Sequence, residues 1–115
     1  MQKTLFIDID GCIFKQSLGV RQQISQAEIL PGVIGKFEEW NKKGYKIILT
    51  TGRKECIRET TEKQLLGYGL IWDKLIMDCG TGPRVLINDM KPDSEEIMAS
   101  CFNLKRNSGL SECEI

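Results

Sequence analysis

Histidine is absent from the 115 residues of this chain. Its absence excludes Ser-His-Asp and Cys-His catalytic arrangements, and it excludes zinc or iron sites built on imidazole. Acid–base chemistry near neutral pH is therefore left to carboxylates, lysines, tyrosines or thiols. Any bound metal is expected to be a hard cation held by oxygen ligands.

The sequence also lacks the cysteine spacing of disulfide pairs, the apolar runs of membrane spans and an excess of charge of either sign. The five cysteines are odd in number and widely spaced, without a C-x-x-C pair, which argues against a disulfide framework or a zinc knuckle. No apolar run approaches the roughly 18 residues of a membrane span, and nothing resembles a signal peptide. Sixteen basic residues balance sixteen acidic ones, which gives no electrostatic reason to expect a nucleic-acid partner. These features predict one cytoplasmic domain over 1–115, without a membrane partner.

The hydrophobic pattern predicts strands that alternate with helices. Strands are expected at Leu5–Ile7, Tyr45–Leu49, Lys74–Met77, Arg84–Ile87 and Cys101–Leu104. A helix is expected after Pro31, with Lys42-Lys43-Gly44 as its C-terminal stop. Further helices are expected from about Lys54 to Leu66, where the sequence is polar and rich in charge, and from Ser94 to Ala99, with a loop over 12–30 and a frayed tail over 105–115. The expected fold class is α/β: a Rossmann-like three-layer sandwich with a mainly parallel five-stranded sheet.

Polar side chains follow three of the expected strands. Asp8 and Asp10 follow the first, Thr50 and Thr51 the second, and Asn88 with Asp89 the fourth. The carboxyl ends of parallel strands share one edge of a sheet, where reactive sites of such folds lie. Carboxylates gathered there could attack an electrophile, transfer a proton and hold Mg²⁺. The start of the next helix, at Thr51 and Gly52, is a favourable position for an anion.

Three segments together resemble the haloacid dehalogenase (HAD) superfamily of phosphohydrolases. They are Leu5-Phe6-Ile7-Asp8-Ile9-Asp10-Gly11, Ile47-Ile48-Leu49-Thr50-Thr51-Gly52-Arg53 and Val85-Leu86-Ile87-Asn88-Asp89, and the resemblance runs from about residue 3 to 104. It implies a phosphatase in which Asp8 forms an aspartyl-phosphate. Asp10 would protonate the leaving oxygen and then activate water. Thr51, with Gly52, would bind the phosphoryl group.

The resemblance also implies a Mg²⁺ site and a cation that bridges nucleophile and phosphate. Asp89 would ligate Mg²⁺ with the Asp8 carboxylate and the Asp10 backbone carbonyl, with Asn88 and Asp93 as second choices. The cation has no clear match: Lys74, Arg84 and Lys91 are candidates, and Arg84 or Lys91 is preferred for phosphate binding. Cys12 stands where the family usually has threonine. Arg53 fits a structural salt bridge as well as a phosphate contact.

Only 40 residues separate Asp10 from Thr51, which leaves no room for a cap domain in a HAD-like protein. The open site would suit a bulky substrate, or a homo-oligomer in which a neighbouring subunit acts as the lid. Loop 12–30 offers Phe14, Lys15, Arg21 and Gln22 as substrate contacts. We expect a Mg²⁺-dependent phosphomonoesterase acting on a small phosphorylated metabolite such as a sugar phosphate. The alternatives are a phosphatase acting on polynucleotide ends and a catalytically degenerate binding module.

Overall fold

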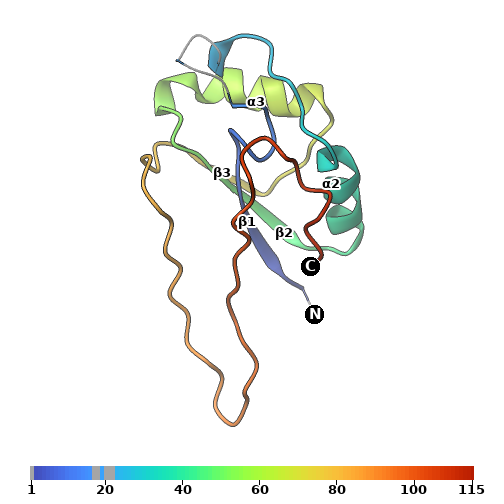
Figure 1. Ribbon diagram of the computed structural model, residues 1–115, viewed down its shortest axis with the longest axis vertical. Helices are drawn as coiled ribbons and strands as arrows, with labels where there is room; N and C mark the ends of the chain where they lie inside the picture. Colours follow the sequence, from blue (N-terminus) through green and yellow to red (C-terminus); the bar gives the residue numbers. More distant parts are fainter. Residues whose placement is uncertain (1, 17–18, 20–22) are drawn as a thin grey trace.

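Among the residues that the structure describes, the named elements are three parallel strands, two α-helices and one 3₁₀ helix (Figure 1). The computed structural model describes residues 2–16, 19 and 23–115. Strand β1 (Thr4–Asp8) is followed by helix α2 (Val33–Lys42), strand β2 (Lys46–Thr50), the short 3₁₀ helix η1 (Glu55–Ile57), helix α3 (Arg58–Gly67) and strand β3 (Lys74–Ile76). The predicted α/β class with a parallel sheet is therefore confirmed.

The sheet order is β1-β2-β3, and both pairings are parallel. The register places Asp8 opposite Thr50 and Thr50 opposite Ile76, so the three strands end at the same level. Alternate residues of each strand enter the core, because successive side chains of a strand point to opposite faces. The buried set consists of Leu5, Ile7, Ile47, Leu49 and Leu75. This common end of the strands is where the sequence predicts the site.

Helix α2 begins and ends as its sequence predicts. Gly32 precedes it with a φ of 77°, a conformation that favours glycine, and Gly44 follows its last turn with a φ of 73°. Val33, Phe37 and Trp40 are spaced four and three residues apart, so they share one side of the helix, and all three are buried. The helix is thereby anchored to the single hydrophobic core.

The segment expected to be one polar helix is divided into η1 and α3. Only Thr61 and Leu65 of α3 are buried. The exposed side carries ion pairs one turn apart, Arg58 with Glu62 and Lys63 with Glu59. The charged side chains of α3 thus pair with one another on the side of the helix away from the core.

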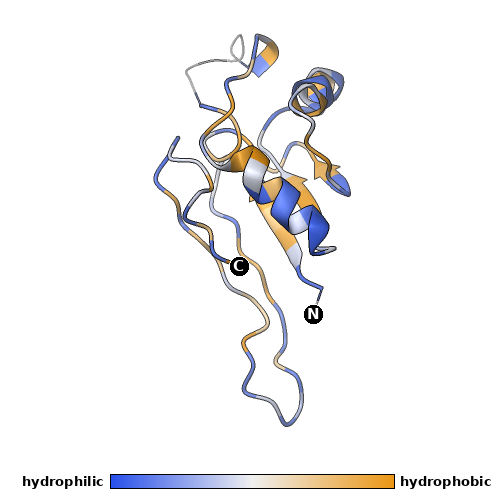
Figure 2. Ribbon diagram, turned by 90° about the vertical axis from the view of Figure 1, so that its right-hand side faces the viewer, coloured by the Kyte–Doolittle hydropathy of each residue, from blue (hydrophilic) through white to orange (hydrophobic). Residues whose placement is uncertain are grey.

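The five-stranded sheet is a wrong prediction, since the described residues form three strands. The expected strands at Arg84–Ile87 and Cys101–Leu104 and the expected helix at Ser94–Ala99 are irregular. Residues 80–104 instead make a long excursion from the body of the molecule (Figure 1), on which hydrophobic and hydrophilic residues are interspersed (Figure 2). Val85 and Ile87 are 82% and 88% exposed. A β-strand needs a neighbouring strand with which to pair, and a local apolar pattern does not provide one. No strand in the described residues pairs with this segment.

The C-terminal residues pack against the core, contrary to the expected frayed tail over 105–115. Leu110 and Cys113 are buried, and the backbone N–H of Leu110 donates to the Pro31 carbonyl at 3.0 Å. A Cβ atom at Gly109 would lie 2.1 Å from the Pro31 carbonyl oxygen, so only glycine permits this approach. Among the helices the structure describes, none is long and apolar enough to cross a membrane.

Candidate active site

A tight turn follows β1 and presents the first two carboxylates. The backbone N–H of Ile9 donates to Asp8 Oδ1 at 3.0 Å, and the N–H of Gly11 donates to the Phe14 carbonyl at 2.7 Å. Gly11 has a φ of 93°, which an L-residue rarely adopts, so glycine is required where the chain reverses. Ile9 and Phe14 are fully buried and anchor the turn below the site.

The Asp8 carboxyl lies in a crowded environment although the residue is exposed. Partial desolvation raises its pKa above the ordinary aspartate value. The N–H of Ile9 and the positive charge of Arg84 act in the opposite direction, while the negative charge of Asp10 raises the pKa further. The two aspartates are therefore close enough to interact, and a cation from residues 80–104 acts on the same carboxyl.

Asp10 is held by Arg53 through two hydrogen bonds. Arg53 Nε donates to Asp10 Oδ2 at 2.9 Å, and one terminal nitrogen of Arg53 donates to Oδ1 at 2.8 Å. The Arg53 side chain is 1% exposed and that of Asp10 18%. Such a bidentate pair fixes both the position and the plane of the carboxylate. The sequence leaves Arg53 open to a structural salt bridge or a phosphate contact, and the structure shows the salt bridge.

Thr51 and Gly52 connect the ends of β2 and β3. The N–H of Thr51 donates to the Ile76 carbonyl, and the Thr51 carbonyl accepts from the N–H of Cys79. The buried Thr51 hydroxyl accepts from the N–H of Arg53 at 3.1 Å. A Cβ atom at Gly52 would lie 2.8 Å from the Gly80 carbonyl oxygen. The glycine after Thr51 is therefore required for the two loops to approach.

The three candidate cations occupy different positions. Lys74 begins β3, at the end of the strand opposite the predicted site. Lys91 lies on the excursion, where its Nζ is 3.9 Å from Asp89 Oδ1. Arg84 donates to the Gly82 carbonyl and is the one whose charge acts on the Asp8 carboxyl. These positions favour Arg84 over Lys74 and Lys91 as the cation nearest Asp8.

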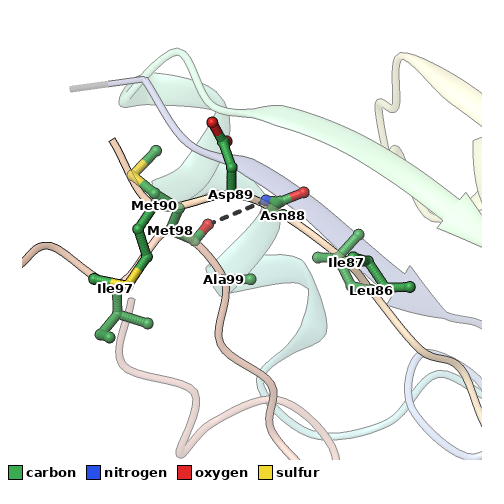
Figure 3. A pocket seen from close by; sticks show the side chains of 8 residues that line it. All are labelled: Leu86, Ile87, Asn88, Asp89, Met90, Ile97, Met98 and Ala99. Carbon is green, nitrogen blue, oxygen red and sulfur yellow. Dashed lines mark hydrogen bonds between the residues drawn. The ribbon is translucent and has the colours of Figure 1, made fainter. Parts of the chain in front are cut away.

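Asp89 does not join Asp8 and Asp10. It lies on the excursion with its side chain 79% exposed, and the excursion runs past the amino end of β1, away from the end that carries Asp8 (Figure 1). Asn88 Nδ2 donates to the Met98 carbonyl at 3.4 Å, and Figure 3 shows the Asp89 carboxylate pointing away from the pocket of about 280 Å³ between the two arms. Asp93 is exposed and has a φ of 60°.

Magnesium therefore has no three-carboxylate cage in this arrangement. Among residues 2–16, 19 and 23–115, no group of three or more histidine, cysteine, aspartate or glutamate side chains could hold a metal ion. Asp8 and Asp10 are near each other, but the third ligand implied by the resemblance is elsewhere. The described donor set does not fit the expected Mg²⁺ site.

Two further residues, one bound to the turn after β1 and one to Arg53, carry no expected role in the sequence. Asn107 accepts from the N–H of Gln16 through Oδ1 at 2.8 Å, and its own N–H donates to the Gly11 carbonyl at 2.9 Å. Gln64 holds Arg53 from helix α3, with Arg53 Nη1 donating to Gln64 Oε1 at 2.6 Å. No local sequence signal distinguishes either residue, because each contact joins distant parts of the chain.

Loop 12–30 borders a polar pocket of about 310 Å³ beside Arg53. Two of the expected substrate contacts, Phe14 and Lys15, line it together with residues 25–28. Phe14 is fully buried, so its ring supports the pocket wall rather than offering an open surface. The expected contacts Arg21 and Gln22 lie outside the described residues.

Comparison with known proteins gives structural neighbours only. No family model matches the chain, and no curated protein matches it. One chain of a Pnkp1/Rnl/Hen1 complex matches with a TM-score of 0.56 and 27% identity over 73% of this chain and 30% of its own length. A structural-genomics target from Vibrio cholerae matches with a TM-score of 0.57 and 17% identity, over 76% of this chain and 80% of its own.

A third neighbour is a D,D-heptose 1,7-bisphosphate phosphatase from B. bronchiseptica, complexed with magnesium and phosphate. It matches with a TM-score of 0.50 and 18% identity, over 85% of this chain and 56% of that one. The chain thus spans less than a third of the first of these neighbours and just over half of the phosphatase. Together these similarities show that the chain shares the fold of these proteins, one of which is a phosphatase.

Proposed function

We propose that this protein is a phosphomonoesterase that works through an aspartyl-phosphate on Asp8. The observation that carries the proposal is that Asp8 and Asp10 lie close enough for their charges to interact, at the end of β1 where Asp8 pairs with Thr50, the residue before Thr51. The fold similarity to a phosphatase supports it. The predicted substrate is a small phosphorylated metabolite such as a sugar phosphate, since the zero net charge offers no track for a polyanion.

The proposed reaction has two transfers. An Asp8 carboxylate oxygen attacks phosphorus, the bond from phosphorus to the ester oxygen breaks, and the leaving oxygen takes a proton from Asp10. Water then attacks the phosphorus and gives its proton to Asp10, while the electron pair of the breaking bond returns to the Asp8 carboxylate. Asp8 suits the nucleophile because it is the exposed member of the pair.

Phosphate binding is assigned to Thr51, Gly52 and one cation. A hydroxyl that accepts one hydrogen bond, as that of Thr51 does, still has its own proton to donate to a phosphoryl oxygen. Arg84 is our choice for the bridging cation, because its charge already acts on Asp8. A guanidinium there would bind phosphate as a planar fork.

We also propose that turnover requires Mg²⁺, on the support of the magnesium bound to the heptose bisphosphate phosphatase. No step above is routed through the ion, because the described carboxylates do not form its site. Chelation should then abolish phosphate release. Full activity in the presence of a chelator would show that turnover does not require Mg²⁺.

The test is phosphate release from an aryl phosphate by the wild type, Asp8→Asn and Asp78→Asn. Asp78 is a matched control: it follows β3 at the same edge of the sheet, with a φ of 60° that asparagine tolerates. We expect Asp8→Asn to lose all measurable turnover and Asp78→Asn to keep it. Equal rates in all three proteins would reject Asp8 as the nucleophile. No turnover by the wild type on a broad ester panel would favour a binding module.

A polynucleotide end is the second candidate substrate. The absence, in the described residues, of a domain covering the site favours it, because an uncovered site can admit the end of a long chain. Inhibition of aryl phosphate hydrolysis by single-stranded oligonucleotides, weakening steeply with salt, would support this candidate. Inhibition by sugar phosphates alone would support the small metabolite.

A further inference from the structure

Arg53 is a buried cation whose guanidinium is fixed from several sides. Arg53 is 2% exposed, and its guanidinium carbon lies 5.8 Å from the centre of the Phe14 ring. Nε and one terminal nitrogen bind the two oxygens of Asp10. The other terminal nitrogen donates to Thr61 Oγ1 at 3.0 Å, to Gln64 Oε1 at 2.6 Å and to the Gln23 carbonyl at 3.3 Å. The side chain is therefore committed to holding its neighbours.

The contact with Asp10 fixes the orientation of its carboxyl group. Arginine offers only donors, and here two of them meet both carboxylate oxygens. Two parallel bonds of this kind hold the plane of the carboxylate, which one bond alone would leave free to turn. The geometry thus keeps both Asp10 oxygens in fixed positions, as proton transfer to Asp10 in the second transfer requires.

We propose that Arg53 is a positioning residue that keeps Asp10 oriented for hydrolysis of the aspartyl-phosphate. The inference rests on the proposed function and deepens it. In this step water attacks phosphorus, a proton of that water passes to an Asp10 oxygen, and the electron pair of the breaking bond returns to Asp8. Arg53 touches neither water nor phosphate; it acts through Asp10.

The two halves of the Arg53 environment can be separated by substitution. Gln64→Ala removes a contact on the side away from Asp10 and also releases the Gln23 and Ser25 carbonyls, which Gln64 Nε2 binds. It leaves both Arg53–Asp10 bonds in place. Arg53→Lys keeps the charge but loses the fork, and Arg53→Met loses both. A purely structural role for Arg53 predicts similar losses for Gln64→Ala and Arg53→Lys.

The experiment compares these variants on dinitrophenyl phosphate, whose leaving group needs no proton from Asp10. The first turnover, the steady-state rate and the acid-trapped phosphoenzyme are measured. We expect the Arg53 variants to keep the first turnover, to lose on the order of 10²-fold in steady-state rate, and to accumulate phosphoenzyme. Gln64→Ala should resemble the wild type. Thermal melting identifies unfolded variants, and Arg53→Lys serves if Arg53→Met does not fold.

Two results would overturn the inference. If first turnover and steady-state rate fall together in the folded Arg53 variants, Arg53 does not act on the second transfer. If Gln64→Ala accumulates phosphoenzyme as strongly as Arg53→Lys, the effect is one of general packing. A wild type without turnover or phosphoenzyme is a different failure, because it removes the proposed function and this inference with it.

Discussion

At the scale of single residues, the Asp10–Arg53 pair combines a structural and a proposed chemical role. Arg53 is almost fully buried, and Asp10 is its counter-charge. A buried cation without a partner is costly, so the pair is needed by the fold as well as by the site. The spacing of Asp10 from Asp8 is visible in the sequence. Choosing between a salt bridge and a phosphate contact for Arg53 requires the position of helix α3, which the local sequence does not give.

Asp10→Asn should lower the free energy of unfolding by about 3 kcal/mol, because it leaves the buried guanidinium without its counter-charge. Urea denaturation measures this loss. Asp78→Asn is the control, since its ion pair with Lys54 is exposed and worth about 1 kcal/mol or less. Equal stability of the two variants would show that the Asp10–Arg53 bond contributes no more than a surface pair.

Cys12 should react slowly with alkylating reagents. Burial, with further contributions from Asp8 and Cys113, raises the pKa of its thiol to about 11. The thiolate is the reactive form, so little of it is present at pH 7 to 8 and the alkylation rate should rise towards pH 11. Peptide mass spectrometry with iodoacetamide checks this against the exposed Cys56 and Cys101. Rapid labelling of Cys12 at neutral pH would contradict the environment described here.

At the scale of elements, those set by the local sequence could be predicted, and those that depend on contacts with distant residues could not. Strand β1, helix α2 and strand β2 lie within two residues of their predicted bounds, because alternation, helical spacing and a terminal glycine are local signals. The sequence at Arg84–Ile87 has the same apolar character, yet it forms no strand. The packed tail, with Leu110 and Cys113 in the core, also depends on contacts with residues far away in the chain.

The excursion should be the first part of the chain to be cut by trypsin. Arg84 lies on an exposed, irregular segment with few backbone hydrogen bonds, whereas Lys42 ends a packed helix. Mass spectrometry of a short digestion should find cleavage after Arg84 first. Protection of Arg84 while Lys42 is cut would mean that residues 80–104 are ordered against the sheet in solution.

At the scale of the whole molecule, balanced charge and an uncovered site restrict the substrate. Sixteen positive and sixteen negative charges give no long-range attraction for a polyanion. Hydrolysis of a small phosphate ester should therefore change less than about threefold between 50 and 200 mM salt, whereas a protein that contacts 6–10 nucleic-acid phosphates loses roughly 10³–10⁵ in affinity over that range. Steady-state kinetics at the two salt concentrations checks this, and a steep loss would favour the polynucleotide end.

The central claim is that Asp8 takes the phosphoryl group, and trapping the intermediate tests it most directly. The protein is mixed with dinitrophenyl phosphate, quenched in acid and digested, and the peptide that contains Asp8 is weighed. We predict that this peptide gains one phosphoryl group, on Asp8, and that the gain is absent in Asp8→Asn. Phosphate release by a wild type that never carries phosphate on this peptide would contradict the account.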